Sequence, residues 1–230
     1  MRVAILQSNY VPWKGYFDLI HDVDLFIFYD EIKYTKNDWR NRNKIYTKNG
    51  LQWLSIPIES HFVNHKISEV TFKNNAWQEL HYKTLSFSYR SAPCYPQLAN
   101  LIENYLVKEK WIHLKDLNHY LIKTISKNIG IKTEFRDSSE FDLQGDRIQR
   151  LLNLLIQAKA TEYISGPSAI GYMEPYLTLF KENNIKVTFK SYPNYTPYKQ
   201  LSEPFQQHVS ILDMIAHLPF SEINSYIWKD

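Results

Sequence analysis

The sequence predicts an α/β fold in which helices flank a mostly parallel, Rossmann-like sheet. Residues 3–6 and 25–29 are continuous apolar runs, as expected of strands that are buried on both faces of a parallel sheet. Stretches with helical spacing alternate with further strand-like runs along the chain. No internal repeat, low-complexity tract or linker interrupts the 230 residues. We therefore expect one α/β domain over residues 1–230.

The remaining elements follow from local pattern. Strands are expected at residues 51–58, 67–72, 131–136, 162–166 and 185–190. Helices are expected at residues 75–89, 97–129, 147–159 and 210–218. The helical segment at about 75–128 is interpreted as an insertion or a crossover between parallel strands. Gly130 is a natural C-terminal residue for the last helix of that segment.

Composition describes an ordinary globular chain with many aromatic rings. The 44% hydrophobic and 22% charged content is typical of soluble proteins. Aromatic residues make up 15%, including 17 Tyr, which suits a pocket that stacks rings or sugars. A Tyr-rich core of the kind that AT-rich coding produces is the alternative.

Charge and hydropathy narrow the classes of partner. The net charge of +3 is too mild to demand nucleic acid and is compatible with an anionic small molecule. No apolar stretch is long enough for a membrane span or a signal peptide, and the single cysteine excludes an internal disulfide. We therefore expect a cytoplasmic protein.

Polar residues follow both opening strands. Gln7, Asn9 and Tyr10 come after the first strand, and Asp30 comes after the second. Because ligands of open parallel sheets bind beyond the carboxyl ends of the strands, we expect the floor of a site here. The first turn lacks the glycines of a phosphate-binding loop, although Lys14 supplies a positive charge. A packed core with a solvated loop is the alternative.

A dense polar cluster surrounds Trp39. Arginine presents a planar fork that binds phosphate or carboxylate through two parallel hydrogen bonds. Two arginines two residues apart point to the same side of an extended chain. The cluster is therefore the expected grip for an anion, with a solvated charged loop as the alternative. Its polar members are Lys36, Asp38, Arg40, Asn41 and Arg42.

Histidines occur in two helical spacings. Trp77 and His81 are four residues apart, so a helix places them on one face, where His81 is a candidate general base or acid. A satisfied core histidine is the alternative. His61 and His65 are also four apart, but no third ligand accompanies them, so no metal site is expected.

Two later segments supply further candidates for substrate binding. Ser165 and Gly166 end a short strand just before a helix start, which is again a ligand-binding geometry. Tyr198 and Gln200 lie in a Tyr/Pro-rich loop that is expected to cover the site.

Several runs, taken in order, resemble the WbqC-like family over essentially the whole chain. The run QSNYVPWKGYF at 7–17 is similar to the family's QPxYLPWxGYF opening, and YTKNDWRNR at 34–42 is close to its YTKRDWxNR run. Ser8 departs from the proline that the family usually has, which loosens the turn without removing a reactive group. The further matches include Trp77, His81, Tyr163, Ile164, Ser165, Gly166, Tyr172, Tyr198, Gln200, Leu212 and Asp213.

The resemblance implies a transferase of bacterial O-antigen or other surface-polysaccharide synthesis. Such an enzyme adds an acyl or aminoacyl group to the amine of a nucleotide-linked amino sugar. The donor is not identified; acyl-CoA or an acyl carrier fits. In this hypothesis His81 takes the proton, Asp38 or Asp30 orients or replaces it, Arg40 and Arg42 bind pyrophosphate, and Tyr10 and Trp13 stack on base or sugar. The substrate-binding set also includes Gln7, Asn9, Lys14, Lys36, Asn41, Trp77, Ser165, Gly166, Tyr172, Tyr198 and Gln200.

Two alternatives remain open. The opening is similar, more distantly, to nucleotidylyltransferase-type (HUP) folds, which implies a ligase or nucleotidylyltransferase with ATP phosphates on Lys14 and Lys36 and Mg²⁺ at Asp30. The slot for the HxGH motif of those folds holds P-W-K-G-Y without histidine, which argues against that mechanism. The other alternative is a non-catalytic binding protein of the same pathway. The sequence predicts no oligomeric state.

Overall fold

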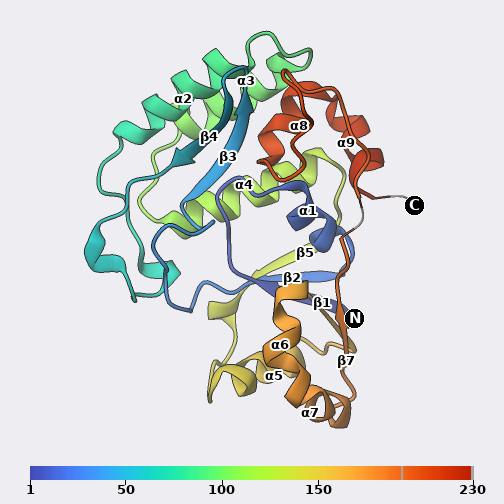
Figure 1. The fold of residues 1–230 in the computed structure, drawn as a ribbon. Coiled ribbons are helices and arrows are strands. Elements are labelled where there is room, and N and C mark those ends of the chain that lie inside the picture. The colour runs from blue at the N-terminus through green and yellow to red at the C-terminus, as the bar shows by residue number, and fades with distance from the viewer. Residues whose placement is uncertain (193, 229–230) are drawn as a thin grey trace.

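A computed structural model describes residues 1–192 and 194–228. Its centre is a five-stranded sheet in the order β5-β2-β1-β6-β7 (Figure 1), and every neighbouring pair is parallel. Counted along the chain, the sheet strands follow the order 3-2-1-4-5 of Rossmann folds. The predicted α/β fold is confirmed. The strands are β1 Arg2–Leu6, β2 Leu25–Phe28, β5 Glu134–Asp137, β6 Glu162–Ser165 and β7 Lys186–Phe189.

The central strands are apolar throughout because both faces of the sheet are covered. Val3 and Ile5 of β1 pack on one side, whereas Ala4 packs on the other, as the twofold alternation of a strand requires. The helices on the Val3 side form the lower part of Figure 1. They are α5 Arg147–Gln157, α6 Ile170–Met173 and α7 Leu177–Glu182.

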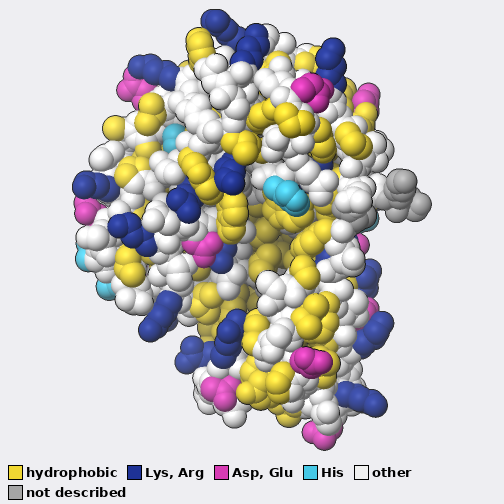
Figure 2. Space-filling model, viewed as in Figure 1, with side chains coloured by type: hydrophobic (Ala, Val, Ile, Leu, Met, Phe, Trp, Pro, Cys, Tyr) yellow, Lys and Arg dark blue, Asp and Glu magenta, His cyan; other side chains and the backbone are white. Residues whose placement is uncertain are grey.

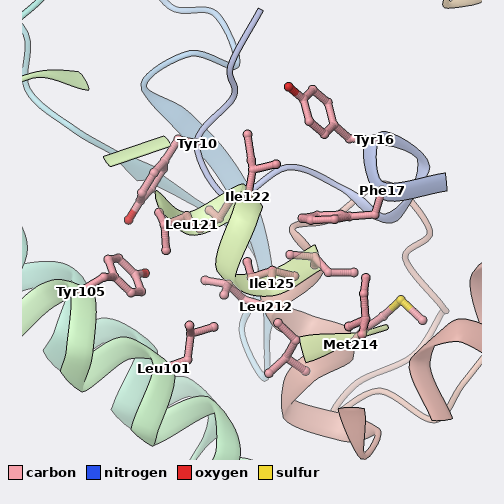
Figure 3. Close-up of a cluster of buried hydrophobic side chains, with 14 of the residues drawn as sticks. Tyr10, Tyr16, Phe17, Leu101, Tyr105, Leu121, Ile122, Ile125, Leu212 and Met214 are labelled. Carbon is pink, nitrogen blue, oxygen red and sulfur yellow. The ribbon is translucent and has the colours of Figure 1, made fainter. Parts of the chain in front are cut away.

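The opposite face carries the larger core. There α4 packs Leu121, Ile122 and Ile125 toward Phe17 of α1, and Figure 3 shows these side chains in one cluster with Tyr10. The elements on this side are α1 Lys14–His21, α2 Ala76–Tyr89, α3 Tyr95–Glu103, the π-helical turn Asn104–Lys108, α4 Leu114–Asn128, α8 Ile211–His217 and α9 Phe220–Ile227.

The segment after β2 differs from the strand prediction. Strand β4 (Gly50–Ser55) pairs antiparallel with β3 (Arg42–Thr47), so it forms a separate hairpin rather than a strand of the main sheet. The strand expected at 67–72 was wrong: Ile67–Glu69 is a 3-10 turn. Ile67 and Val70 are buried three residues apart, and this helical spacing outweighs the β-branched character of the run.

The helix ends follow the local signals. Asn75 is the N-cap position of α2, and the side chain of the preceding Asn74 accepts the amide of Ala76 at 3.0 Å. After α4, Gly130 adopts φ +85, the left-handed conformation that closes a helix. The long helical prediction at 97–129 is interrupted between α3 and α4, where the chain makes the π-helical turn and then an extended stretch before His113.

Candidate functional site

From β1 the sheet extends through β2 and β5 on one side and through β6 and β7 on the other, so the strand order reverses between β1 and β6. This is the switch point where ligands bind in open α/β folds. The face in Figure 2 is hollowed between the body above and the α5–α7 layer below, and hydrophobic side chains line the hollow. Ser165 ends β6 at this point, and Gly166 follows it. Ser165 is buried and accepts the hydroxyl of Tyr163, whereas a Cβ added to Gly166 would meet no atom within 4 Å.

Arg40 gathers the polar residues that follow β1. Its guanidinium donates to Oδ1 of Asn9 and, at 3.2 Å, to Oε1 of Gln7. A carboxylate oxygen of Asp38 lies 3.7 Å from the same group. The structure thus brings together four predicted site residues. Because these acceptors already occupy the guanidinium, Arg40 mainly orients the side chains of this edge.

Asp38 is held as an anion. Burial raises its pKa, but Arg40, the hydroxyl of Thr35 and the amide of Trp39 outweigh burial, so the pKa of Asp38 lies below its ordinary value. Thr35 donates to it at 2.7 Å, and so does the amide of Trp39. A carboxylate stabilised in this way is a poor proton acceptor at neutral pH.

Arg42 diverges from Arg40, contrary to the expectation for an extended chain. Residues 36–41 form turns, and Asn37 has φ 61, so the alternation of an extended strand begins only with β3. Arg42 lies over the ring of Trp53 on the hairpin. Asn41 is buried and donates to the carbonyl of Ile56 at 2.8 Å, while Lys36 is exposed.

A histidine that the sequence did not suggest lies at the end of β2. Nε2 of His119 is 2.8 Å from Oδ2 of Asp30, and Oδ1 of Asp30 accepts the amide of Ser8 at 2.9 Å. The imidazole also stacks on Phe28, with ring centroids 3.8 Å apart. Asp30 is 0% exposed and His119 is partly buried, so a buried carboxylate orients a ring that stays partly accessible.

The second ring nitrogen of His119, Nδ1, lies near another carboxylate. Nδ1 lies 3.9 Å from Oδ2 of Asp137, too far for a hydrogen bond, and Lys115 lies 3.4 Å from the same oxygen. Burial raises the pKa of Asp137, but the hydrogen bonds from Ser139 and the charge of Lys115 lower it below its ordinary value. Among the described residues, Nδ1 of His119 therefore has no hydrogen-bond partner.

An aromatic cavity of about 250 Å³ opens beside Asn9. Trp13 and Trp39 form walls of this cavity, and His208 lies 5.0 Å from Trp13 between ring centroids. Trp39 is 43% exposed. We call this space the tryptophan cavity; its lining residues are Asn9, Pro12, Trp13, Trp39, Asn43 and His208.

The last part of the chain completes that cavity. Ser210 pairs with Trp13 in an isolated β-bridge. The Ser210 amide donates to the carbonyl of Lys44 at 2.8 Å, and the Ser210 hydroxyl donates to the carbonyl of Val11 at 2.8 Å. Asn43 Nδ2 donates to the carbonyls of Tyr10 and Val11 from the other side. Two distant segments, β3 and the stretch at Ser210, thus fix the position of Trp13.

The α5–α6 side of the switch point carries arginines and tyrosines. The guanidinium carbon of Arg147 lies 3.8 Å from the ring centroid of Tyr172. Burial raises the pKa of Tyr29, and the nearby Arg150 and Arg147 oppose the rise. Tyr172 was predicted from the sequence, whereas the two arginines and Tyr29 were not.

His81, Tyr10 and Trp77 form a buried aromatic group. The Tyr10 hydroxyl lies 2.9 Å from His81 Nδ1, and the Tyr10 and Trp77 rings meet edge to face at 6.3 Å. Burial lowers the pKa of His81 to about 4 and raises that of Tyr10, so the neutral imidazole accepts a hydrogen bond from the protonated hydroxyl. At 2% exposure His81 is shielded from any solute. None of the three lines the tryptophan cavity.

Lys14, Tyr198 and Gln200 meet in a different buried network. Asp213 accepts from Tyr198 at 2.7 Å and from Gln200 at 2.9 Å, and burial raises its pKa. The ammonium of Lys14 packs over the rings of Tyr195, Tyr198 and Phe205, and burial lowers the pKa of Lys14 to about 8. This network binds the C-terminal loop to α1 and α8 rather than lining the tryptophan cavity.

A larger cavity, of about 360 Å³, lies between α1 and α9. Its charged groups are already paired, because Lys190 contacts Asp18 at 2.8 Å and also Asp22, and Tyr195 donates to Asp18. The tryptophan cavity is smaller, but its lining residue Asn9 follows the carboxyl end of β1, so it is the better candidate site.

The described part of the chain contains neither a metal-binding cluster nor a membrane-spanning helix. Within residues 1–192 and 194–228, no group of three His, Cys, Asp or Glu side chains is arranged to hold an ion. His65 is within 3.4 Å of Glu69, with the ring of His61 6.2 Å away. No helix of that part is long and apolar enough to cross a bilayer.

Sequence comparison agrees with the resemblance seen in the motifs. The model of the WbqC-like protein family matches residues 7–225. The uncharacterized protein Rv1507c of Mycobacterium tuberculosis is 43% identical over 218 residues, which is 94% of each chain. No solved structure matches the chain.

Proposed function

The chain belongs to the WbqC-like protein family, and we propose that it is a cytoplasmic transferase of surface-polysaccharide or O-antigen synthesis. The reaction proposed is transfer of an acyl or aminoacyl group to the amine of a nucleotide-linked amino sugar. One observation carries this proposal: a carboxylate-oriented histidine, His119, lies at the same strand edge as the tryptophan cavity. Asn9 lines the cavity, and Asp30 binds the backbone of the adjoining Ser8.

The tryptophan cavity suits a sugar ring. Indole faces pack against the C–H faces of sugars while amides bind hydroxyl groups, and the cavity offers Trp13, Trp39 and Asn9 for these contacts. The edge of the cavity that contains Asn9 leads through Ser8 to Asp30. We therefore place the sugar in the cavity with its amine toward His119.

His119 then acts as general base in a balanced transfer. The amine nitrogen attacks the carbonyl carbon of an activated acyl ester or thioester, a C–N bond forms, and the C–O or C–S bond breaks. His119 Nδ1 takes a proton from the amine nitrogen and passes it to the departing oxygen or sulfur. Asp30 stabilises the imidazolium that forms in between. In this proposal His81 supports the fold, and the role predicted for it passes to His119.

The test is a product assay with the intact protein. Nucleotide-linked amino sugars are incubated either with acyl-CoA or an acyl carrier thioester, or with ATP, Mg²⁺ and the free acid. The masses of the products are determined by mass spectrometry. We expect one sugar to gain an acyl mass with a thioester donor and without ATP. Loss of this product in His119→Gln, with full activity in the exposed His61→Gln control, supports the assigned base.

The other outcomes separate the alternatives. Product formation only with ATP and release of pyrophosphate favours the nucleotide-dependent ligase. Binding of a nucleotide sugar without any product favours the non-catalytic pathway protein. Full turnover in His119→Gln removes the proposed mechanism.

A further inference from the structure

The outer face of the β3–β4 hairpin carries an exposed aromatic and cationic surface. Trp53 projects from β4 and is 41% exposed. Its ring lies 5.6 Å from that of Trp39, measured between centroids, at an interplanar angle of 34°. Two large exposed indoles side by side are uncommon on a surface without a binding role. We call Trp39, Trp53, Arg42 and Lys44 the hairpin platform.

The cations of the platform come from the paired strand. Lys44 is the register partner of Trp53. Arg42 precedes Lys44 by two residues, so the side chains of Arg42 and Lys44 point to the same face of β3. The guanidinium carbon of Arg42 lies 4.2 Å from the Trp53 ring centroid, and Nζ of Lys44 lies 5.0 Å from it. Within residues 1–192 and 194–228 neither cation forms an ion pair with a carboxylate. Their charge is therefore available to an anion.

The platform is continuous with the tryptophan cavity. Trp39 belongs to both, since it walls the cavity and also packs beside Trp53. Asn43, which lines the cavity, precedes Lys44 directly in β3. A ligand that leaves the cavity past Trp39 therefore meets Trp53 and the two cations next.

The size of the cavity requires such an extension. Pockets that enclose a whole small-molecule ligand measure about 300–1,000 Å³. The tryptophan cavity, at about 250 Å³, lies below this range. A sugar carrying a nucleoside diphosphate is larger than one ring, so part of it lies outside the cavity.

We propose that the hairpin platform binds the nucleoside diphosphate half of the substrate. The base stacks on the indoles of Trp39 and Trp53, and the diphosphate binds the side chains of Arg42 and Lys44. Stacked aromatic rings flanked by cations are a recurrent way to hold nucleotides. The inference rests on the proposed function for the identity of the ligand. It fixes the substrate direction, with the nucleotide over the hairpin and the sugar amine toward His119.

The test measures binding rather than turnover. UDP, CDP, GDP and dTDP are titrated into the intact protein, followed by calorimetry and by quenching of tryptophan fluorescence. Removing one stacking ring costs about 5- to 150-fold in affinity, the equivalent of the usual stacking contribution of one base. We expect a loss in this range for the preferred nucleotide in Trp53→Ala, and retention of most affinity in Trp53→Phe, which keeps a ring.

The cations are tested together and against matched surface controls. Arg42→Gln combined with Lys44→Gln is expected to weaken diphosphate binding at least tenfold and to reduce its dependence on salt. Phe87→Ala and Lys83→Gln change an exposed ring and an exposed lysine of α2, far along the chain from the platform, and are expected to leave affinity unchanged. Melting temperatures check that each variant is folded. If Trp53→Ala does not fold, the affinity of the cation double variant tests the inference.

The outcomes separate this inference from the proposed transfer reaction. Unchanged affinity in both platform variants overturns the inference, and so does the absence of nucleoside diphosphate binding to the wild-type protein. If acyl transfer occurs but nucleotide binding does not depend on the platform, the transferase function is supported and the inference about the platform is contradicted. If nucleotide binding depends on the platform but no donor gives an acylated product, the nucleotide site is supported and the transferase function is contradicted.

Discussion

Oδ2 of Asp30 lies 2.8 Å from Nε2 of His119, although 89 residues separate the two along the chain. The carboxylate is fixed by the amide of Ser8, and the imidazole by its stack on Phe28. Asp30 follows β2, whereas His119 belongs to the helix that leads toward the neighbouring β5. Parallel packing of these strands is what brings His119 to the end of β2.

The first prediction concerns this pair. Asp30→Asn keeps the shape of the side chain but removes the charge that orients and stabilises the imidazolium. We expect kcat to fall by about 10²- to 10⁴-fold, the usual range for loss of general base catalysis, with a smaller change in KM. Steady-state kinetics of the transfer reaction measures both. Asp116→Asn, at an exposed position in the first turn of α4, is the matched control. An unchanged kcat in Asp30→Asn contradicts the assignment.

The second prediction is an acid sensitivity caused by His81. The pKa of His81 is about 4 in the folded protein and 6.5 in its ordinary state, because burial disfavours the charged imidazole. The unfolded chain therefore binds a proton first as pH falls. Stability from this group is complete above pH 6.5 and declines toward pH 4, by about 3 kcal/mol for a shift of this size.

Chemical denaturation at several pH values measures that decline. His81→Gln is expected to be less stable at pH 7, because it disturbs the contact with Tyr10, but to lose less stability between pH 6.5 and 4. His61→Gln, at an exposed histidine, should follow the wild-type curve. Identical pH dependence in His81→Gln and wild type argues against burial as the cause.

The third prediction uses Gly15 to move a cavity wall. A Cβ at Gly15 would lie 2.3 Å from the indole of Trp13, so Gly15→Ala forces that ring to shift. Overpacking of this kind costs about 1–3 kcal/mol and here also narrows or distorts the tryptophan cavity. We expect weaker ligand binding with a modest fall in melting temperature. Gly171→Ala, where the added Cβ meets nothing within 4 Å, is expected to be neutral for both. Wild-type binding in Gly15→Ala shows that the Trp13 wall is dispensable.

The fourth prediction concerns the fork of Arg40. Arg40→Lys cannot reach Gln7, Asn9 and Asp38 together, so it leaves acceptors at the strand edge without donors. A loss of about 1–3 kcal/mol in the free energy of unfolding is expected. The same exchange at Arg136, in an exposed pair with Glu140, should change it by less than about 1 kcal/mol. Equal effects at both positions contradict the organising role of Arg40.

The sequence was most informative where local pattern decides structure. The apolar runs at 3–6 and 25–29 are β1 and β2, and the predicted order of later strands and helices holds for β5, β6 and β7. The run at 67–72 misled because a β-branched stretch can also be buried by a 3-10 turn docked on a strand end. Its Ser68 amide donates to the carbonyl of Asp30.

The site was harder to predict because its members meet only through tertiary packing. Asn9 is predicted because it follows the first strand, and Asp38 and Arg40 are predicted because they belong to the polar cluster around Trp39. His119 shares a helix with an apolar face, and only its spacing of four from Lys115 marks a second, polar face. Trp53 and His208 gave no signal, because nothing in their own neighbourhoods shows that the hairpin and the C-terminal loop flank Trp13.

The bridge between Trp13 and Ser210 has a consequence for synthesis of the chain on the ribosome. Residues from the first and last tenths of the sequence form the tryptophan cavity together, so a nascent chain has no such cavity until His208 and Ser210 have emerged. The buried core around Ala4, Phe26 and Ile122 also contains residues of helices before His208 and of the helices α8 and α9 after it. A chain that stops before His208 therefore lacks one wall of the cavity and the bridge that fixes Trp13.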